Sequence, residues 1–379
     1  MNIVTAIVFW AFVVWLVMQL CYALYFYSRI LFLDTDKPAR ETNARQPASI
    51  IICAKNEAQN LIANLPLILE QNYFTNTGQP LFEVLVINDA STDDTAQVTL
   101  GLQQRYAHLR LINIPAGTPH TLKGKKFALK TGVAAAAHEW LLLTDADCLP
   151  SGKNWLREMA APLAEGKQIV AGYGGYFKAP GLLNAFNRWE TIHTFLQLFS
   201  YAKAGLPYMA VGRNMACTKT VMQLAEQSAV WNLSPSGDDD LLVKVCGTPA
   251  NYAVVANAGA FTHTSAQTSL KGWMKQKQRH LSDGKSYKPG IQYLLGSYGY
   301  TLAAVWLYSA VLLFTGYWQW TLALMAARCI IYWWLWSVTA RKLKVNDIFY
   351  LMPLFDIGWM VFNFAFFPYI ALKNKQHWK

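Results

Sequence analysis

Asp145 and Asp147 are the two residues of this sequence whose types and spacing most directly suggest chemistry. They follow the apolar run 140–143, which predicts a buried strand. Two carboxylates this close repel each other unless a cation lies between them. Oxygen ligands suit Mg²⁺ or Mn²⁺, and such an ion is commonly shared with substrate phosphates. The alternative is a polar turn after a strand, because D-x-D alone occurs in many loops.

A second acidic group, Asp238-Asp239-Asp240, follows a turn rich in Ser, Pro and Gly. A hydroxyl that attacks a carbon centre must lose its proton, and a carboxylate within hydrogen-bond reach can accept it. Three adjacent acids also repel one another, which raises the pKa of at least one. The alternative is a helix N-terminus, where acids interact favourably with the helix dipole. If both acidic groups act in one reaction, they must lie within a few ångströms of one reacting centre.

A basic segment at 271–288 supplies candidate partners for an anionic substrate. Gln276 and Arg279 are three residues apart, so on a helix they share one face. An arginine binds a phosphate group through two parallel hydrogen bonds. The alternative is a basic amphipathic helix that lies on a membrane surface, and one helix can serve both purposes.

Strands alternate with helices along the first half of the chain. The residue patterns predict strands at 49–54, 82–88, 109–114 and 140–143, and helices from 56 to about 70 and from 125 to 137. This alternation predicts an α/β fold, with a mostly parallel sheet covered by helices on both faces. Ligands of such sheets bind at the carboxyl ends of the strands.

Several polar or functional positions fall at those strand ends. We expect one ligand-binding rim to contain Ala54, Lys55, Asn56, Glu57, Asn88, Asp89, Asp145 and Asp147. A parallel sheet needs no acids there for its stability, which favours a binding role for Asp89, Asp145 and Asp147. Asp93 and Asp94 are interpreted as helix-capping residues only.

The composition indicates membrane-spanning segments. Only 15% of the 379 residues are charged, compared with about 25% in soluble domains. Residues 1–28 contain no Asp, Glu, Lys or Arg, which predicts an uncleaved transmembrane helix over 1–30. The stretch 298–340 carries one charge, Arg328, and a turn at 316–320 divides it into two spans. Residues 346–372, with Pro353 and Asp356, form either a further span or a re-entrant segment.

The domain order predicted from these patterns is a transmembrane helix at 1–30, a catalytic domain at 35–290 and transmembrane helices at 296–372. Basic residues flank the predicted spans, which places the catalytic domain in the cytoplasm of a multi-pass cell-membrane protein. The basic tail (Lys373, Lys375, Lys379) would lie outside after a fourth full span, so its side is left open. The net charge of +11 is attributed to anionic lipid, and no nucleic-acid partner is expected. The six scattered cysteines favour a reducing compartment.

Six segments, taken together, resemble family-2 glycosyltransferases of the membrane-bound inverting type with a GT-A catalytic domain. They are SIIICAKNEAQNL (49–61), VLVINDASTDDT (84–95), GKKFALKTGV (124–133), LLLTDADCLP (141–150), SGDDDLL (236–242) and QKQRH (276–280). They occur in the order typical of that family. The sequence lacks G-x-G-x-x-G, which argues against a dinucleotide enzyme.

The resemblance implies that a sugar is transferred from a nucleotide-diphosphate donor, commonly a UDP-sugar. Ala54, Glu57 and Asp89 match positions that hold the uracil and ribose, and Lys125 matches a lysine near the nucleotide. Asp147 matches the metal ligand of the D-x-D motif, and Asp145 matches its ribose-side and metal-shell acid. Asp239 matches the catalytic base and Asp238 its acidic neighbour, with Asp240 as the alternative because the run permits a shift of one residue.

Two departures from the family pattern bear on the acceptor. His280 stands where many members have the tryptophan of QxxRW, and together with Gln276 and Arg279 it completes the expected substrate-binding group. Asn88 stands where an aspartate is common. Without that tryptophan, and with few spans, the sequence favours transfer of one sugar to a lipid or other hydrophobic acceptor. The alternatives are a processive polysaccharide synthase and a non-catalytic membrane scaffold.

Four further features carry weaker expectations. His263 is interpreted as a hydrogen-bonded structural residue rather than a metal ligand. Residues 212–214 are expected to precede a helix and to line the acceptor site. The amphipathic stretch 183–201 forms either buried core or a helix on the bilayer near the acceptor entrance. Arg328 should face protein, water or a headgroup, because a charge within a span is costly.

Overall fold

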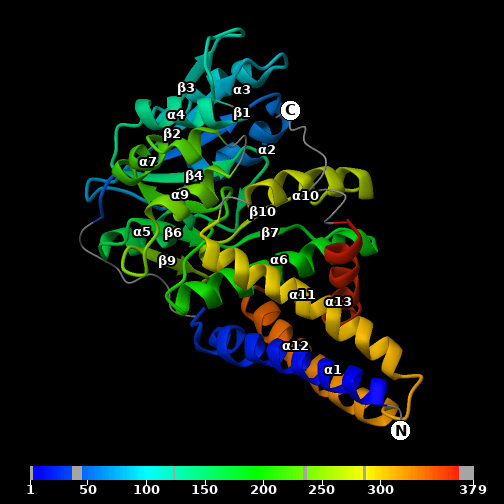
Figure 1. The fold of residues 1–379 in the computed structure, drawn as a ribbon. Coiled ribbons are helices and arrows are strands. Elements are labelled where there is room, and N and C mark those ends of the chain that lie inside the picture. Colours follow the sequence, from blue (N-terminus) through cyan, green and yellow to red (C-terminus); the bar gives the residue numbers. More distant parts are fainter. Residues whose placement is uncertain (1–2, 36–44, 123, 234–236, 285–286, 367–379) are drawn as a thin grey trace. The chain divides into compact units, whose positions relative to one another are not determined.

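The computed structural model describes residues 3–35, 45–122, 124–233, 237–284 and 287–366 (Figure 1). Contacts within the chain divide it into two compact units. The sheet unit contains residues 34–177 and 205–267, and the helical unit contains 1–33, 178–204 and 268–374. Each unit is therefore assembled from segments that are distant in sequence, and each is described by itself.

The sheet unit is built on a seven-stranded sheet with the strand order β3-β2-β1-β4-β8-β6-β9. The strands are β1 (Ala48–Ala54), β2 (Phe82–Asp89), β3 (Leu109–Ile114), β4 (Trp140–Asp145), β6 (Ile169–Gly172), β8 (Met215–Thr218) and β9 (Tyr252–Val255). All pairings are parallel except those of β8, which runs antiparallel to both β4 and β6. A second, small sheet has the order β5 (Leu149–Pro150), β10 (Thr262–Thr264), β7 (Gly174–Tyr176). The predicted α/β class and the four predicted strands are confirmed.

The register of the parallel strands brings their carboxyl ends to one edge. Cys53 lies opposite Asp145, and Ala54 lies opposite Asn88. Asp89 is paired with Ile114 at the end of β3. The rim expected from the sequence is therefore a feature of the fold, since the strands before Glu57, Asp89 and Asp147 end side by side.

Helices cover both faces of this sheet. On one face, α2 (Ala58–Leu69), α3 (Thr95–Gln103) and α5 (Trp155–Ala164) share a buried core with Ile50 and Ile52 of β1. On the other face, α4 (Lys126–Ala135) packs on β1 and β2, beside α7 (Lys219–Glu226) and α9 (Asp238–Cys246). A Cβ atom on Gly132 of α4 would lie 2.7 Å from Ile51 Cγ2, so the close packing of this helix requires glycine. The short helix α8 (Ala229–Leu233) precedes α9.

The expectation for residues 212–214 is wrong in its secondary structure. They precede β8, a strand in the middle of the sheet, and not a helix. Met215, Ala216 and Cys217 are fully buried between β4 and β6. A run of four residues is too short for its periodicity to distinguish a buried strand from the start of a helix.

The helical unit begins with α1 (Ile3–Cys21), which continues through a π turn, η1 (Tyr22–Phe26), and a 3₁₀ turn, η2 (Tyr27–Phe32). The other helices are α6 (Leu182–Lys203), α10 (Leu270–Gly284), α11 (Pro289–Leu312), α12 (Trp318–Lys342), η4 (Phe349–Leu351), α13 (Met352–Val361) and η5 (Phe362–Phe366). The predicted division of the stretch 298–340 into two helices is confirmed, but the break lies between Leu312 and Trp318, slightly before the predicted turn at 316–320.

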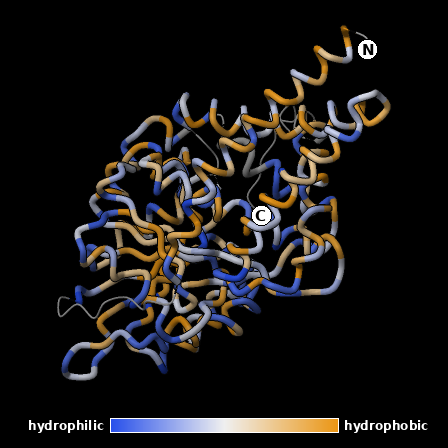
Figure 2. Tube along the Cα trace, turned by 90° about the horizontal axis from the view of Figure 1, so that it is seen from below, coloured by the Kyte–Doolittle hydropathy of each residue, from blue (hydrophilic) through white to orange (hydrophobic). Residues whose placement is uncertain are grey.

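Among the described residues, two segments are long and apolar enough to cross a membrane, Ile3–Phe32 and Trp318–Lys342. Apolar residues follow one another along the N-terminal helix in Figure 2. The sequence predicted three or four membrane spans, whereas two segments of the described chain have the length and apolarity of a span. The 24-residue helix α11 does not meet the same test of apolarity, and α13 is only ten residues long. The basic tail lies outside the described residues.

Arg328 was expected to face protein, water or a headgroup, and in the structure it faces protein. Its guanidinium is fully buried in the helical unit and makes a two-point ion pair with Asp356 of α13. It also donates to the side-chain carbonyl of Gln19 at 3.0 Å, and Trp306 Nε1 donates to Asp356 at 3.1 Å. These bonds join α1, α11, α12 and α13 and satisfy a charge that hydrocarbon would not.

Residues 183–201 were expected to form either buried core or a helix on the bilayer, and in the structure they belong to α6, which is a buried core helix. Trp189, Ile192 and Phe199 are buried, as are the polar residues Arg188 and His193. A helix with buried residues all round its axis is a core helix, whereas a helix lying on a bilayer keeps one polar face in water.

Candidate active site

Lys125 brings the two acidic groups of the sequence together. Its ammonium lies 3.1 Å from Asp145 Oδ1 and 3.3 Å from Asp238 Oδ2. Lys125 precedes α4, Asp145 ends β4 and Asp238 begins α9, so three separate elements meet at one cation. Burial works to lower the pKa of Lys125, but Asp145 and Asp238 raise it well above its usual value. The lysine therefore stays charged and links the D-x-D turn to the acidic helix.

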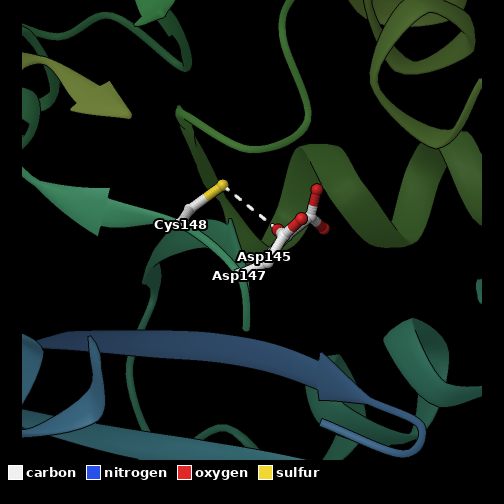
Figure 3. Close-up of side chains that lie close together, drawn as sticks. All are labelled: Asp145, Asp147 and Cys148. Carbon is white, nitrogen blue, oxygen red and sulfur yellow. Dashed lines mark hydrogen bonds between the residues drawn. The ribbon is translucent and has the colours of Figure 1, made fainter. Parts of the chain in front are cut away.

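The D-x-D turn has the composition of a site for a hard divalent cation. Asp145, Asp147 and Cys148 place one ligand atom each within 4.8 Å of one another (Figure 3). The turn is held by a hydrogen bond from Asn64 Nδ2 to the Ala146 carbonyl, at 3.1 Å. Cys148 Sγ donates to Asp147 Oδ1 at 3.5 Å, and burial raises the pKa of this thiol well above its usual value. The ligands on offer are thus carboxylate oxygens, which fit Mg²⁺ or Mn²⁺.

Asp239 is held as a proton acceptor would need to be. Its Oδ2 accepts the Gly212 N–H at 2.5 Å, and its Oδ1 accepts the Asp240 N–H at 2.9 Å. Burial and the neighbouring Asp238 raise the pKa of Asp239 to about 6, although Lys125 works to lower it. A carboxylate with this pKa releases and accepts protons near neutral pH, where general bases are most effective.

Two loops of the rim are locked to each other after β1 and β2. Asn56 and Ala90 adopt left-handed backbone conformations, with φ of 57° and 51°. The Asn56 N–H donates to Ser91 Oγ at 2.9 Å, and Lys55 pairs with Asp89 at 3.4 Å. Non-glycine residues adopt this conformation only where their surroundings enforce it, and such positions cluster at ligand sites.

Ala54 and Glu57 lie on the same loop as these residues. Ala54 is fully buried at the end of β1. The Glu57 N–H donates to Thr95 Oγ1 at 2.9 Å, and its carboxylate accepts from Asn60 at 2.5 Å. The three residues predicted to hold the uracil and ribose, Ala54, Glu57 and Asp89, therefore lie at or just after the carboxyl ends of two adjacent strands.

Asp93 has the structural role that the sequence suggested. Its carboxylate accepts the Ala58 N–H at 3.1 Å and the Thr95 N–H at 3.0 Å. It therefore caps α2 as well as the start of α3. Asp94 precedes α3 without a capping bond from its side chain.

Arg213 is the functional candidate that the sequence indicated least clearly. Its guanidinium donates to the Gly174 carbonyl and lies 4.8 Å from the centre of the Tyr176 ring. Burial works to lower the pKa of Arg213, whereas Tyr176 and then the Asp145 and Asp147 carboxylates raise it. Arg213 therefore places a positive charge near Asp145 and Asp147. The spacing of these residues in the sequence did not indicate that they lie close together.

Two other residues that the sequence singled out have structural roles. Asn214 is fully buried, and its side chain bonds Trp155 Nε1 at 2.9 Å and the Tyr173 carbonyl at 2.8 Å. His263 lies 3.4 Å from Ser151 Oγ through Nδ1, beside the ring of Phe177. The interpretation of His263 as a hydrogen-bonded residue agrees with this contact.

Gln276, Arg279 and His280 all lie on α10, which belongs to the helical unit. The side chains of Arg279 and His280 lie outside the described part of the chain. Their predicted roles in donor binding remain predictions.

Comparison with known proteins identifies the domain around this site. Residues 49–215 match the model of the family described as Glycosyl transferase family 2. These residues form a family-2 glycosyltransferase domain. The resemblance found in the sequence is confirmed, and the domain is that of an enzyme that transfers sugars.

Two curated relatives match part of this chain. Dolichyl-phosphate beta-glucosyltransferase ALG5D of Trichomonas vaginalis is 31% identical over 130 residues, covering 29% of this chain and 36% of the relative. Glycosyltransferase AglE of Haloferax volcanii is 25% identical over 187 residues, covering 49% of this chain and 55% of the relative. The chain thus spans about a third to about half of the length of these relatives.

One solved structure matches almost the whole chain. It is the mannosyltransferase PcManGT from Pyrobaculum calidifontis in complex with GDP-Man and Mn²⁺. The two share a TM-score of 0.58 and 17% sequence identity, over 95% of this chain and 99% of that one. The chain therefore has a GT-A-like α/β fold with a mostly parallel central sheet.

Proposed function

We propose that this protein is a membrane-integral inverting glycosyltransferase. It moves one sugar from a nucleotide-diphosphate donor, a UDP-sugar, to a lipid or other hydrophobic acceptor. The observation that carries the proposal is the contact of Lys125 with both Asp145 and Asp238. This contact supports one reaction centre, because Asp145 belongs to the D-x-D turn and Asp238 precedes the candidate base Asp239, and a single displacement requires these groups close together.

In the proposed reaction, Asp239 accepts the proton of the acceptor hydroxyl while that oxygen attacks the anomeric carbon of the sugar. The bond between this carbon and the diphosphate oxygen breaks, and its electron pair leaves with the nucleoside diphosphate. One displacement inverts the anomeric configuration. The Gly212 and Asp240 N–H groups fix the orientation of Asp239, and Asp238 acts through its charge on that base.

On the donor side, Ala54, Glu57 and Asp89 hold the base and ribose. Asp145 and Asp147 hold Mg²⁺ or Mn²⁺. A bound ion of this kind stabilises the negative charge that develops on the departing diphosphate. Lys125 adds positive charge at the same place. Gln276, Arg279 and His280 of α10 contribute further donors to the phosphates.

The proposed membrane placement rests on the segment Ile3–Phe32. Only 17% of the most apolar part of this segment is buried inside the protein. The apolar surface that remains exposed needs a lipid environment. The basic residues that flank the proposed spans support a cytoplasmic sheet unit in a multi-pass cell-membrane protein. A lipid acceptor is supported by the relative named as a dolichyl-phosphate glucosyltransferase.

Transfer by the detergent-purified protein tests this function. Radiolabelled UDP-sugars are supplied with a polyprenyl phosphate, with Mn²⁺ or with a chelator, and the lipid phase is counted. We expect labelled lipid with Mn²⁺, and loss of label with chelator and in Asp147→Asn. Asp94→Asn is the matched control, because Asp94 is an exposed acid that makes no capping bond.

Two results would overturn the proposal. Metal-independent labelling that persists in Asp147→Asn would remove the assigned metal site. Long sugar chains formed from the donor alone would replace the single transfer by a processive synthase.

A further inference from the structure

A pocket of about 460 Å³ lies in the helical unit, apart from the residues assigned to catalysis. It is lined by Leu24, Tyr25, Ser28, Arg29, Phe32 and Lys203. The first five residues follow α1, and Lys203 is the last residue of α6. The lining combines two cations with apolar and aromatic side chains and contains no acid.

The helix is not an α-helix where it forms this pocket. Leu24 and Tyr25 lie in the π turn, and Arg29 and Phe32 lie in the 3₁₀ turn that follows. In a 3₁₀ turn, residues three apart are stacked above one another, so Arg29 and Phe32 share one edge. Single π turns within α-helices are rare and often mark functional sites.

Both cations are positioned by aromatic rings and not by carboxylates. The Arg29 guanidinium lies 4.5 Å from the centre of the Tyr25 ring, and Lys203 Nζ lies 5.7 Å from that of Phe199. Among the residues that the structure describes, neither cation forms a salt bridge. Two positive charges in a pocket whose lining residues include no acid make it complementary to an anion.

The side chains that line the pocket indicate which kind of molecule the anion belongs to. Leu24, Tyr25 and Phe32 are 64%, 60% and 84% exposed, an apolar surface that water does not favour. Arg29 is the first charged residue of the chain and lies near the carboxyl end of Ile3–Phe32, a segment long enough to span a bilayer. Arginine and aromatic residues at such a position lie at the level of the lipid headgroups.

We propose that this pocket binds the phosphate headgroup of an anionic phospholipid. Arg29 and Lys203 contact the phosphate, and the exposed side chains of Leu24 and Phe32 contact the upper part of an acyl chain. The inference rests on the membrane placement proposed above and is independent of the sugar-transfer chemistry. The bound lipid would join the end of the first span to the end of α6.

Native mass spectrometry of the full-length protein in detergent tests the site. Phosphatidylglycerol is titrated against phosphatidylcholine, in the wild type and in Arg29→Gln/Lys203→Gln. We expect the wild type to retain phosphatidylglycerol, and the variant to bind it about 30-fold more weakly, because two basic residues are removed and each contributes about 1 kcal/mol to binding an anionic lipid. The matched control is Arg105→Gln/Lys153→Gln, which removes two exposed cations from the sheet unit and should bind like the wild type.

Equal retention of the two lipids by the wild type, or equal losses in the two double variants, would overturn the proposal. Displacement of phosphatidylglycerol by inorganic phosphate alone would also overturn it, because a free anion would then be the ligand. Displacement by a polyprenyl phosphate would assign the pocket to the acceptor instead. Carbonate extraction of cell membranes separates the two proposals, since a wild type released by carbonate would contradict membrane integration itself.

Discussion

At the scale of single residues, the site depends on how its charges are neutralised. Asp145, Asp238 and Lys125 form one buried or half-buried group. In this group, each carboxylate lowers the free energy of burying the charged ammonium. No cation of the described part of the chain forms a salt bridge with Asp239, whose carboxylate accepts hydrogen bonds from two N–H groups instead. That difference leaves Asp239 as the acid whose protonation changes most easily near neutral pH.

The pH dependence of transfer follows from this difference. Below about pH 6, Asp239 is protonated and cannot accept the acceptor's proton, because its pKa is raised to about 6. We expect kcat/KM to rise about tenfold per pH unit up to that value and then to level off. A rate profile from pH 4.5 to 8.5 checks this, and a profile that is flat between pH 5 and 7 would contradict the assignment.

The same shift in pKa makes Asp239 costly for stability. The folded protein binds the proton of this acid more tightly than the unfolded chain, so stability falls as pH rises from about 4 through about 6. Above pH 6, Asp239→Asn should therefore be more stable than the wild type, on the order of 2 kcal/mol. The difference should vanish near pH 4, and unfolding in denaturant at both pH values measures it.

Gly212 is a second residue for which the structure predicts a specific effect on sugar transfer. A Cβ atom there would lie 2.9 Å from Asp239 Oδ2, so Gly212→Ala must displace the carboxylate that its own N–H orients. We expect transfer to fall about 10- to 100-fold, because misplacement of a reacting group by about 1 Å has an effect of this size. Gly152→Ala is the control, since a Cβ atom there meets nothing within 4 Å. Equal activity of the two variants would contradict the role of Gly212.

At the scale of elements, alternating patterns predicted β1 to β4 and the helices α2 and α4, with bounds within a few residues. The strand ends carry Glu57, Asp89 and Asp145, which is why the rim could be predicted. β8 could not, because a four-residue buried run has no distinctive period. Nor could the pairing of Lys125 with both acids, because it depends on how α4 and α9 pack beside the end of β4.

Lys125→Met tests this junction of elements. Its ammonium occupies the neighbourhood of Asp145 and so opposes a second cation there. We expect the variant to bind Mn²⁺ about five- to tenfold more tightly without donor, because one like charge is removed, and yet to transfer sugar at least tenfold more slowly. Calorimetry of Mn²⁺ binding alongside the transfer assay checks both. Weaker Mn²⁺ binding by the variant would contradict the proximity of Lys125 to the metal site.

At the scale of the whole molecule, the chain builds two units from interleaved segments. Helix α6 lies in the middle of the sequence but belongs to the helical unit, where Arg188 makes a two-point ion pair with Asp347. Hydropathy could not reveal this membership, because α6 carries buried Asn, Arg, Glu and His residues. Arg328 and Asp356 were both visible as unusual charges, but only the fold shows that they pair.

The Arg328–Asp356 pair should determine the stability of the helical unit. Arg328→Leu leaves Asp356 buried without its cation, which should reduce stability by about 3–5 kcal/mol. The double variant Arg328→Leu/Asp356→Leu should recover most of that loss, because no charge is then left unpaired. Thermal unfolding in detergent measures the cycle, and additive losses would contradict coupling between the two residues.

The most direct test of the central claim measures donor binding and sugar transfer on one preparation of Asp239→Asn. If Asp239 is the base at a centre built by Asp145, Asp147 and Lys125, the variant should bind the donor with Mn²⁺ within about threefold of the wild type. Its transfer rate should fall by about 10²- to 10⁴-fold, as loss of a general base predicts. Transfer within about fivefold of the wild-type rate would contradict the claim.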